Sequence, residues 1–159
     1  MNTEALQIFF SSFSLVALSE MGDKTQLLAF SLSARFKSPK LILSGILVAT
    51  LLNHSLASYL GNWVSVQIST KIMSLILAVL FIAFGLWTLK PDTLDQPKHH
   101  SYGPFLTTVV LFFLAEMGDK TQLATLALGA QYQAPLLVTL GTTVGMLVSD
   151  GLAVFLGGC

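Results

Sequence analysis

The chain repeats part of its own sequence, and this repeat restricts the folds open to it more than any other feature. Residues 20–63 align with residues 116–159 without a gap, at a constant separation of 96 positions. Of the 44 aligned pairs, 19 are identical, too many to result from a shared apolar composition alone. Both copies begin with the same segment, Glu-Met-Gly-Asp-Lys-Thr-Gln-Leu, at 20–27 and 116–123. The chain therefore contains two related units.

The regions around this segment are apolar enough to lie in a membrane. Hydrophobic residues make up 53% of the chain and charged residues 10%, whereas soluble domains carry roughly 25% charged residues. A spanning helix needs roughly 20 mostly apolar residues. We therefore predict an all-α integral membrane protein, in contact with the lipid bilayer, with five spans at about 5–34, 41–61, 70–89, 104–130 and 136–157.

The first and fourth of these spans exceed one bilayer crossing and carry the charged segment. This combination predicts tilted or interrupted helices rather than simple rods. Gly22 and Gly118 lie where an interruption would be easiest, because glycine tolerates unusual backbone conformations.

A polar stretch rich in proline, aspartate, lysine and histidine, from Lys90 to Tyr102, has the composition of an exposed linker. We predict a three-helix unit over 1–90, a linker over 91–103 and a second unit over 104–159 with only two helices. Three spans are an odd number, so the second unit would enter the membrane with opposite orientation, as in the inverted repeats of many secondary transporters. The counterpart of the third span would fall near 166–185, so the sixth span is apparently missing.

The distribution of basic residues predicts the orientation. Loops on the cytoplasmic side carry an excess of lysine and arginine. Arg35, Lys37 and Lys40 flank the first loop, Lys90 and Lys98 flank the linker, and Lys71 alone lies on the other side. The N-terminus is therefore predicted outside the cytoplasm and the linker inside, in a bacterial inner membrane or its equivalent.

Charge and cysteine content argue against other classes. The formal net charge is zero, with eight basic and eight acidic residues, which gives no basic surface for nucleic acid. The single cysteine, Cys159, cannot form an internal disulfide, and no Cys/His cluster has zinc spacing. We expect no cofactor and no enzymatic activity.

The repeated acidic residues predict a cation site. Each ionisable residue deep in a membrane helix costs roughly 2.5–3.5 kcal/mol, so such residues normally face a protein interior or a watery cavity. Glu20 and Asp23 are spaced i, i+3, as are Glu116 and Asp119, which on a helix places each pair on one face. Two inverted copies would bring four carboxylates together at the midplane, where protons or a cation must neutralise them. Oxygen ligands favour calcium, magnesium or manganese, and competition between the metal and protons provides a basis for exchange.

Neighbouring polar residues are candidates for supporting roles. Lys24 and Lys120 each lie i, i+4 from the glutamate of their own segment, where the ammonium could pair with it. Asn53-His54 aligns with Ser149-Asp150, so Asp150 or His54 could relay protons or add a ligand. An ion-pair network that only joins two helices is the alternative, although a scaffold would not need the extra aspartate in both halves. Neutral oxygens that could complete coordination or cap an interrupted helix come from Thr25, Gln26, Thr121 and Gln122.

The two segments resemble the signature of a known family. Residues 20–25 and 116–121 are similar to the duplicated Glu-x-Gly-Asp-(Lys/Arg)-(Thr/Ser) motif of the membrane family once called uncharacterised protein family 0016. That family includes Golgi manganese/calcium transporters, chloroplast and cyanobacterial manganese transporters and bacterial manganese exporters, usually with six spans in a 3+3 arrangement. The resemblance implies exchange of a divalent cation for protons, with the cation held by Glu20, Asp23, Glu116 and Asp119.

Three functional hypotheses follow. The first is a secondary transporter that exports manganese, or calcium, from the cytoplasm in exchange for protons, with a homodimer as one way to supply the missing packing partner. The second is an exporter of small solutes such as amino acids, whose site should offer helix ends and apolar contacts rather than four acids. The third is an intramembrane aspartyl protease, which is disfavoured because Lys24 and Lys120 would disturb a shared-proton dyad.

Overall fold

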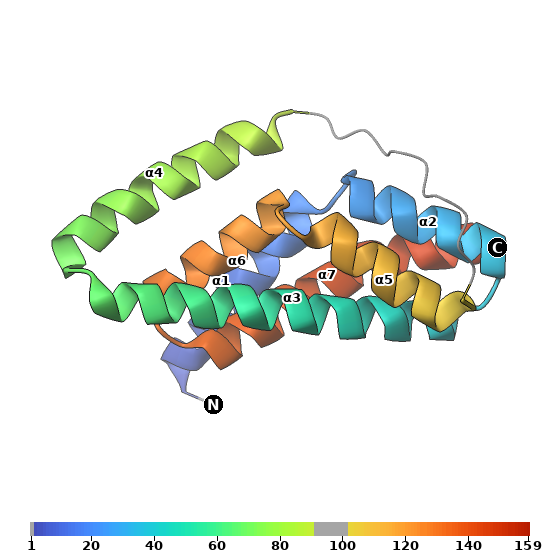
Figure 1. Cartoon of the computed structure of the whole chain (residues 1–159), viewed down its shortest axis with the longest axis horizontal. Coiled ribbons are helices and arrows are strands. Elements are labelled where there is room, and N and C mark those ends of the chain that lie inside the picture. Colours follow the sequence, from blue (N-terminus) through green and yellow to red (C-terminus); the bar gives the residue numbers. More distant parts are fainter. Residues whose placement is uncertain (1, 91–101) are drawn as a thin grey trace.

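The computed structural model describes residues 2–90 and 102–159, and every regular element in these ranges is a helix (Figure 1). The prediction of an all-α membrane fold is confirmed. The part of the linker over 91–101, which includes Lys98, His99 and His100, lies outside the described residues. In chain order the helices are α1 (Thr3–Ser19), α2 (Lys24–Phe36), α3 (Pro39–Gln67), α4 (Thr70–Thr88), α5 (Pro104–Glu116), α6 (Lys120–Tyr132) and α7 (Pro135–Gly158).

The segments predicted at 5–34 and 104–130 are each two helices with a break between them. α1 and α2 are bent by 72° at their break. Gly22 and Gly118 have φ angles of 78° and 75°, positive values that glycine adopts readily and that residues with a side chain rarely adopt. The prediction that each motif interrupts its helix at this glycine is confirmed.

The turns that follow the breaks also recur. α2 and α6 each end at a left-handed residue, Lys37 with φ 50° and Gln133 with φ 51°. α3 and α7 then start with Pro39 and Pro135 at the first helical position, where proline loses no hydrogen bond and its fixed φ suits a helix. Because these residues recur 96 positions apart, both units make the same turn into their long helix.

Within the described ranges, three helices are long and apolar enough to cross a membrane: α3, α4 and α7. A fourth span exists if α1 and α2 cross together as one bent pair, whereas α5 is a shorter apolar helix. The count of five spans, the inverted orientation of the two units and their boundaries at 1–90 and 104–159 stay predictions.

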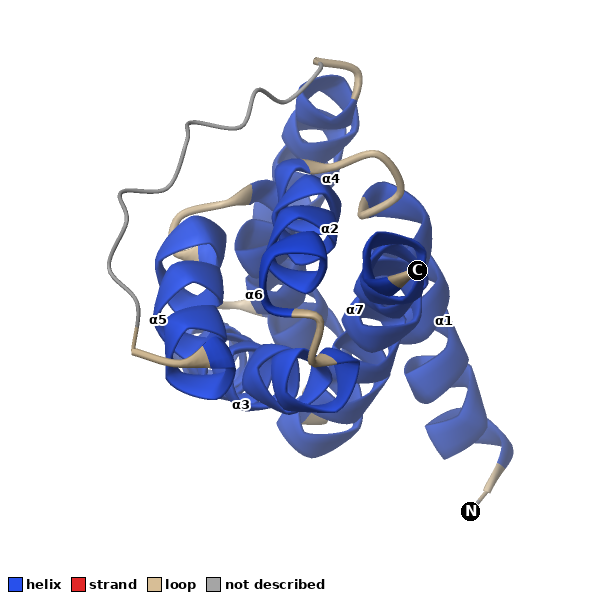
Figure 2. Ribbon diagram, turned by 90° about the vertical axis from the view of Figure 1, so that its right-hand side faces the viewer, coloured by secondary structure: helices blue, strands red, loops and turns tan. Residues whose placement is uncertain are grey.

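The broken helices of each unit pack on the long helix of the other unit. α1 and α2 lie against α7, and α5 and α6 lie against α3, as the end-on view in Figure 2 shows for α1 beside α7 and α5 beside α3. α4 packs mainly along α6 and otherwise stands apart from the bundle (Figure 1). The two units are therefore interlocked rather than stacked side by side.

Repeated glycines allow these contacts between units. A Cβ added to Gly61 would lie 2.0 Å from the carbonyl oxygen of Leu126, and one added to Gly157 would lie 2.4 Å from that of Phe30. These pairs are equivalent in the repeat, as are Gly45 against Phe105 and Gly141 against Phe9. Close approach of helices is the usual role of small residues in membrane interfaces, so the same backbone contact is built twice.

The substitution Gly61→Ala is expected to destabilise the protein, because the new methyl group must push α6 away from α3. Overpacking of this kind costs about 1–3 kcal/mol. The matched control is Gly85→Ala on α4, where an added Cβ meets nothing within 4 Å and helix propensity improves. Thermal unfolding in detergent should show a lower midpoint for Gly61→Ala only, and equal midpoints would contradict the close-packing role.

Candidate cation site

Three acidic side chains meet where the two helix breaks cross. Glu20 caps the C-terminal end of α1, Asp23 caps the N-terminal end of α2, and Asp119 caps the N-terminal end of α6. One ligand atom from each lies within 4.8 Å of the others, and all three residues are buried. The breaks therefore bring carboxylates from both units to one point inside the bundle.

The geometry that produces this meeting differs from the predicted one. Glu20 and Asp23 do not share a helical face, because the chain turns through Met21 and Gly22 between two separate helices. The prediction of an i, i+3 pair on one helix is wrong for both segments. The left-handed glycine breaks the helical periodicity, so helix ends place the carboxylates.

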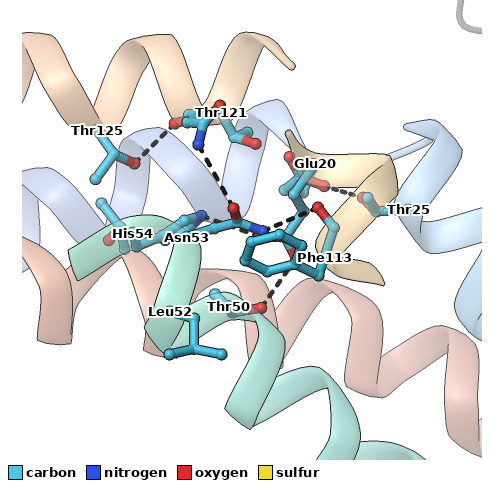
Figure 3. A network of polar contacts seen from close by, with 12 residues as sticks. Glu20, Thr25, Thr50, Leu52, Asn53, His54, Phe113, Thr121 and Thr125 are labelled. Carbon is cyan, nitrogen blue, oxygen red and sulfur yellow. Dashed lines mark hydrogen bonds and ion pairs between the residues drawn. The ribbon is translucent and has the colours of Figure 1, made fainter. Parts of the chain in front are cut away.

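Glu116 lies outside the group of three. Its Oε1 accepts a hydrogen bond of 3.0 Å from the Thr50 hydroxyl, and its Oε2 lies 3.7 Å from His54 Nε2. Figure 3 shows Thr50, Asn53 and His54 close together on α3. The prediction that four carboxylates converge holds for Glu20, Asp23 and Asp119, whereas Glu116, at the end of α5, turns to side chains of α3 beside the group.

The motif lysines pair across the two units. Lys24 Nζ lies 3.5 Å from Asp119 Oδ1, and Lys120 Nζ lies 3.1 Å from Asp23 Oδ1. The predicted pairing of Lys24 with Glu20 is wrong, and the ion pair of Lys120 likewise joins it to the other unit rather than to its own glutamate. The break turns each lysine away from the preceding helix and toward the opposite break. These crossed ion pairs tie the two units together at the acidic group.

The crossed pairs differ in exposure. The Lys24 side chain is 29% exposed, whereas that of Lys120 is 4% exposed. A buried ion pair depends on both partners, since loss of one leaves an uncompensated charge away from water. Loss of one partner should therefore destabilise the protein more at the Lys120–Asp23 pair than at the Lys24–Asp119 pair.

The motif glutamines connect each break to the long helix of the other unit. Gln26 Oε1 accepts a 2.6 Å hydrogen bond from the Gly22 N–H, and Gln26 Nε2 donates to the Ser149 carbonyl at 3.0 Å. In the repeat, Gln122 Oε1 accepts a 2.6 Å hydrogen bond from the Gly118 N–H, and Gln122 Nε2 donates to Asn53 Oδ1 at 3.5 Å. Of the two predicted roles, completing coordination or capping the interrupted helix, these bonds to the backbone of each break are of the second kind, and a ligand role stays a prediction.

The two motif threonines differ. The Thr25 hydroxyl donates to Glu20 Oε2, as Figure 3 shows, whereas Thr121 Oγ1 is buried with no hydrogen-bond partner in the described part of the chain. Sequence reasoning did not identify Thr50 as part of the site. Its repeat counterpart is Met146, so the repeat offered no signal for it.

Buried acids outnumber buried bases around the breaks. Asp150 on α7 is buried, and neither of its carboxylate oxygens has a hydrogen-bond partner among the described residues. Asp150 and Glu116 are close enough to Glu20 to interact with it electrostatically. One oxygen each of Glu20, Asp23 and Asp119 is likewise buried without a hydrogen-bond partner in the described ranges. Buried polar atoms are normally satisfied, so these oxygens form a set suited to a cation.

Helix ends add to the electrostatics of the acidic group. α2 and α6 point their N-terminal ends, which carry partial positive charge, at Asp23 and Asp119. α1 ends at Glu20 with its partly negative C-terminal end, the kind of helix end that coordinates cations in transporters with broken helices. Negative and positive helix ends thus meet at one site.

A cavity of about 320 Å³ borders the acidic group on one side. Asp119 and Gln122 contribute its polar lining, and its remaining wall is mostly apolar side chains of α3, α4 and α6, among them Leu56, Leu60, Trp87 and Leu126. Asp119 therefore lies at the border of this cavity, on the side of α4.

Comparison with known proteins adds information that the geometry lacks. The sequence model of the family described as "Divalent cation/proton antiporter GDT1" matches residues 8–96 and 104–159. The chain is 46% identical over 148 residues to a Vibrio cholerae protein named "Putative manganese exporter", covering 92% of this chain and 74% of the relative. No solved structure matches the chain significantly.

Plant proteins are also similar to the chain. It is 33% identical to GDT1-like protein 3 of Oryza sativa subsp. japonica, with 93% of this chain and 62% of the relative covered. With GDT1-like protein 3 of Arabidopsis thaliana the identity is 32%, over 91% of this chain and 59% of the relative. The chain thus spans less than two thirds of the length of these two plant relatives.

Replacement of Lys120 is expected to destabilise the protein more than replacement of Lys24. Lys120→Met leaves the Asp23 carboxylate buried without its cation, which costs about 3–5 kcal/mol. Lys24→Met removes a partly exposed partner, for which about 1 kcal/mol or less is expected.

Thermal unfolding in detergent measures both effects, and the double variant Asp23→Asn/Lys120→Met provides the control. It should recover much of the stability lost in Lys120→Met, since the orphaned charge is gone and the two sites are coupled. Additive losses in the double variant would show that the crossed pair does not contribute as a pair.

Proposed function

The chain belongs to the GDT1 family of divalent cation/proton antiporters, and on this basis we propose that it exports manganese from the cytoplasm in exchange for protons. The family is one of transporters for divalent cations, so the expectation that the chain is not an enzyme is confirmed, and the protease hypothesis is set aside. The chain is an integral, multi-pass membrane protein. Three parts of this function are proposals: the identity of the ion, the direction of its transport and its exchange with protons.

One observation carries the proposal. Glu20, Asp23 and Asp119 bring carboxylate oxygens within 4.8 Å of one another in a buried position, and each offers an oxygen that no other described group satisfies. Such a set costs free energy unless positive charge compensates it. Carboxylates from two units that approach this closely suit a single divalent ion held between the units.

The ligands would have distinct roles. Glu20, Asp23 and Asp119 supply the first oxygens, while Glu116 and Asp150 provide further negative charge in the adjoining space. Their neutral neighbours hold these acids in place, through Thr25 on Glu20 and Thr50 on Glu116. The predicted ligand role of Glu116 is retained as a proposal, because its buried Oε2 has no hydrogen-bond partner among the described residues.

The lysines act as built-in counter-ions for the empty site. Five carboxyl groups, those of Glu20, Asp23, Glu116, Asp119 and Asp150, are buried around the breaks with two paired ammonium groups. A divalent ion that binds Asp23 and Asp119 competes with Lys120 and Lys24 for the same carboxylates. Ion binding would therefore loosen the crossed pairs that tie the two units together, which links occupancy to movement.

Oxygen ligands and the relatives together favour manganese. Carboxylates bind hard divalent ions such as manganese, calcium and magnesium, and the name of the similar Vibrio cholerae protein refers to manganese. The basic residues Arg35, Lys37 and Lys40 around the α2–α3 turn support an orientation with that turn in the cytoplasm and the N-terminus outside. The name of the Vibrio cholerae relative supports export as the direction. A bacterial inner membrane is the proposed location, and a homodimer stays a prediction.

The variant Asp23→Asn is expected to lose manganese binding and transport, because an amide removes a negative ligand from the centre of the group. Loss of an outer-shell partner alone lowers metal affinity about 10–100-fold, so at least this loss is expected here. Manganese-induced thermal stabilisation and manganese flux into proteoliposomes measure binding and transport. Glu4→Gln on the exposed first turn of α1 is the matched control, and wild-type flux in Asp23→Asn would refute the site.

Exchange with protons predicts that a proton gradient drives manganese movement. In proteoliposomes loaded with a pH indicator, addition of manganese should change the internal pH, and a protonophore should abolish uphill accumulation while leaving downhill flux. Manganese flux without any proton movement would agree with transport of manganese but would contradict its exchange with protons. The Asp119→Asn protein, with one ligand removed, serves as the inactive reference.

A further inference from the structure

Buried hydroxyl groups line the contacts between helices on one side of the acidic group. They lie in the part of the bundle where α1 and α7 begin and α3 and α6 end, which is the end that holds the N-terminus (Figure 1). All of these side chains are buried. This hydroxyl seam comprises the hydroxyl residues Ser12, Ser58, Thr121, Thr125, Thr139, Thr142 and Thr143, together with the imidazole of His54.

Helical spacing and contacts make the seam continuous with the site. Thr121 follows Lys120 of the crossed ion pair, and His54 faces Glu116. One turn further along α3 and α6 lie Ser58 and Thr125. Figure 3 shows Thr121 and Thr125 on α6 close to His54 of α3.

The far end of the seam lies at the start of α7. Ser58 Oγ and Thr139 Oγ1 are 2.6 Å apart, and both donate to the Pro135 carbonyl. Ser12 of α1 lies beside Gly141, where a Cβ added to the glycine would be 2.9 Å from the serine Cβ. Polar side chains thus extend from the acidic group to the first turn of α7.

Several groups in the seam have no hydrogen-bond partner in the described part of the chain: Ser12 Oγ, Thr121 Oγ1, Thr143 Oγ1 and both ring nitrogens of His54. Each buried polar group left unsatisfied costs about 1–3 kcal/mol. Water entering between the helices would satisfy all of them. Hydration therefore favours separation of the helices along this seam.

On the opposite side of the acidic group lie the repeat counterparts of the seam residues. The positions equivalent to Thr125, Ser58 and Thr142 are Ala29, Val154 and Ile46, which belong to the main apolar core. Thr139 and Thr143 correspond to Leu43 and Leu47. Separation of the helices there would expose apolar surface, at about 25 cal/mol for each Å².

Hydroxyls on that opposite side are already satisfied. The Ser33 hydroxyl donates to the Val154 carbonyl at 2.5 Å, and the Thr108 hydroxyl, which is equivalent to Ser12, donates to the Pro104 carbonyl at 2.6 Å. Water that enters there would not satisfy either of these two hydroxyls further, and among the described residues the unsatisfied oxygens on that side are those of Asp150, next to the acidic group. The two halves of the bundle thus share a backbone plan but differ in how readily they admit water.

We propose that the hydroxyl seam is the pathway through which the divalent cation passes between the acidic site and the membrane face at which the N-terminus lies. This inference rests on the proposed transport function. Neutral hydroxyl oxygens coordinate a cation more weakly than carboxylates do, which suits passage rather than capture, since conduction needs sites that are weak enough to leave. The cavity beside Asp119 faces a different side of α6, through Gln122, Leu123 and Leu126, so the two approaches to the site are separate.

Cysteine accessibility tests the pathway without depending on transport. In a chain with Cys159→Ser, single substitutions Ser58→Cys and Thr139→Cys are compared with their repeat counterparts Val154→Cys and Leu43→Cys. A membrane-impermeant, positively charged methanethiosulfonate is added to vesicles on the side of an N-terminal tag and, separately, on the other side. The seam cysteines should react from the tag side at least about tenfold faster than their counterparts from either side, a factor equivalent to about 1.4 kcal/mol. Equal rates in both sets, or no reaction at either seam position in folded protein, would overturn the proposal.

Hydroxyl removal tests passage of the cation itself. Thr139→Val and Ser58→Ala should slow manganese flux while manganese-induced thermal stabilisation stays at the wild-type level, and Thr108→Val, the matched buried control, should leave flux unchanged. Wild-type flux in both seam variants would reject the pathway. Failure of the wild-type protein to bind or move manganese would instead reject the proposed function, and the labelling result would remain interpretable.

Discussion

The burial of unpaired negative charge is the constraint on which the rest of this structure depends. Carboxyl groups at the crossing of two helix breaks are removed from water, and Lys24 and Lys120 compensate only part of their charge. Because each lysine reaches the aspartate of the other unit, the compensation also fastens the two halves together. In the proposed function, a divalent cation at the same carboxylates would compete with the contacts that hold the halves, which would join binding to conformational change.

Interlocked packing makes this coupling possible. The broken helices of each unit lie on the long helix of the other, with repeated glycines at the crossings. The motif glutamines make the same cross-connections, Gln26 to Ser149 and Gln122 to Asn53. In the described chain, the acidic group takes residues from both units, so movement of one unit against the other would change the distances between its carboxylates. The duplicated backbone nevertheless carries unlike side chains, and the hydroxyl seam is present on one side only.

Much of the fold was predictable because it follows from local rules. Apolar stretches, the positions of Pro39 and Pro135, and the glycines at the breaks each act on neighbouring residues. Two predictions about the site were wrong for one reason. The i, i+3 pairing of Glu20 with Asp23 and the i, i+4 pairing of Lys24 with Glu20 both assume a continuous helix, and Gly22 ends that helix between the partners.

The sequence by itself determined that the chain is a helical membrane protein with a duplicated acidic segment, since composition, repeat spacing and residue chemistry are written along the chain. Only the tertiary structure decided which acids share a point, that Lys120 serves Asp23 of the other unit, and that Glu116 turns to Thr50. Those partners from different units lie 66 to 99 positions apart in the sequence. Such contacts depend on how bent helices cross, and neither local spacing nor residue type specifies the angle or depth of a crossing.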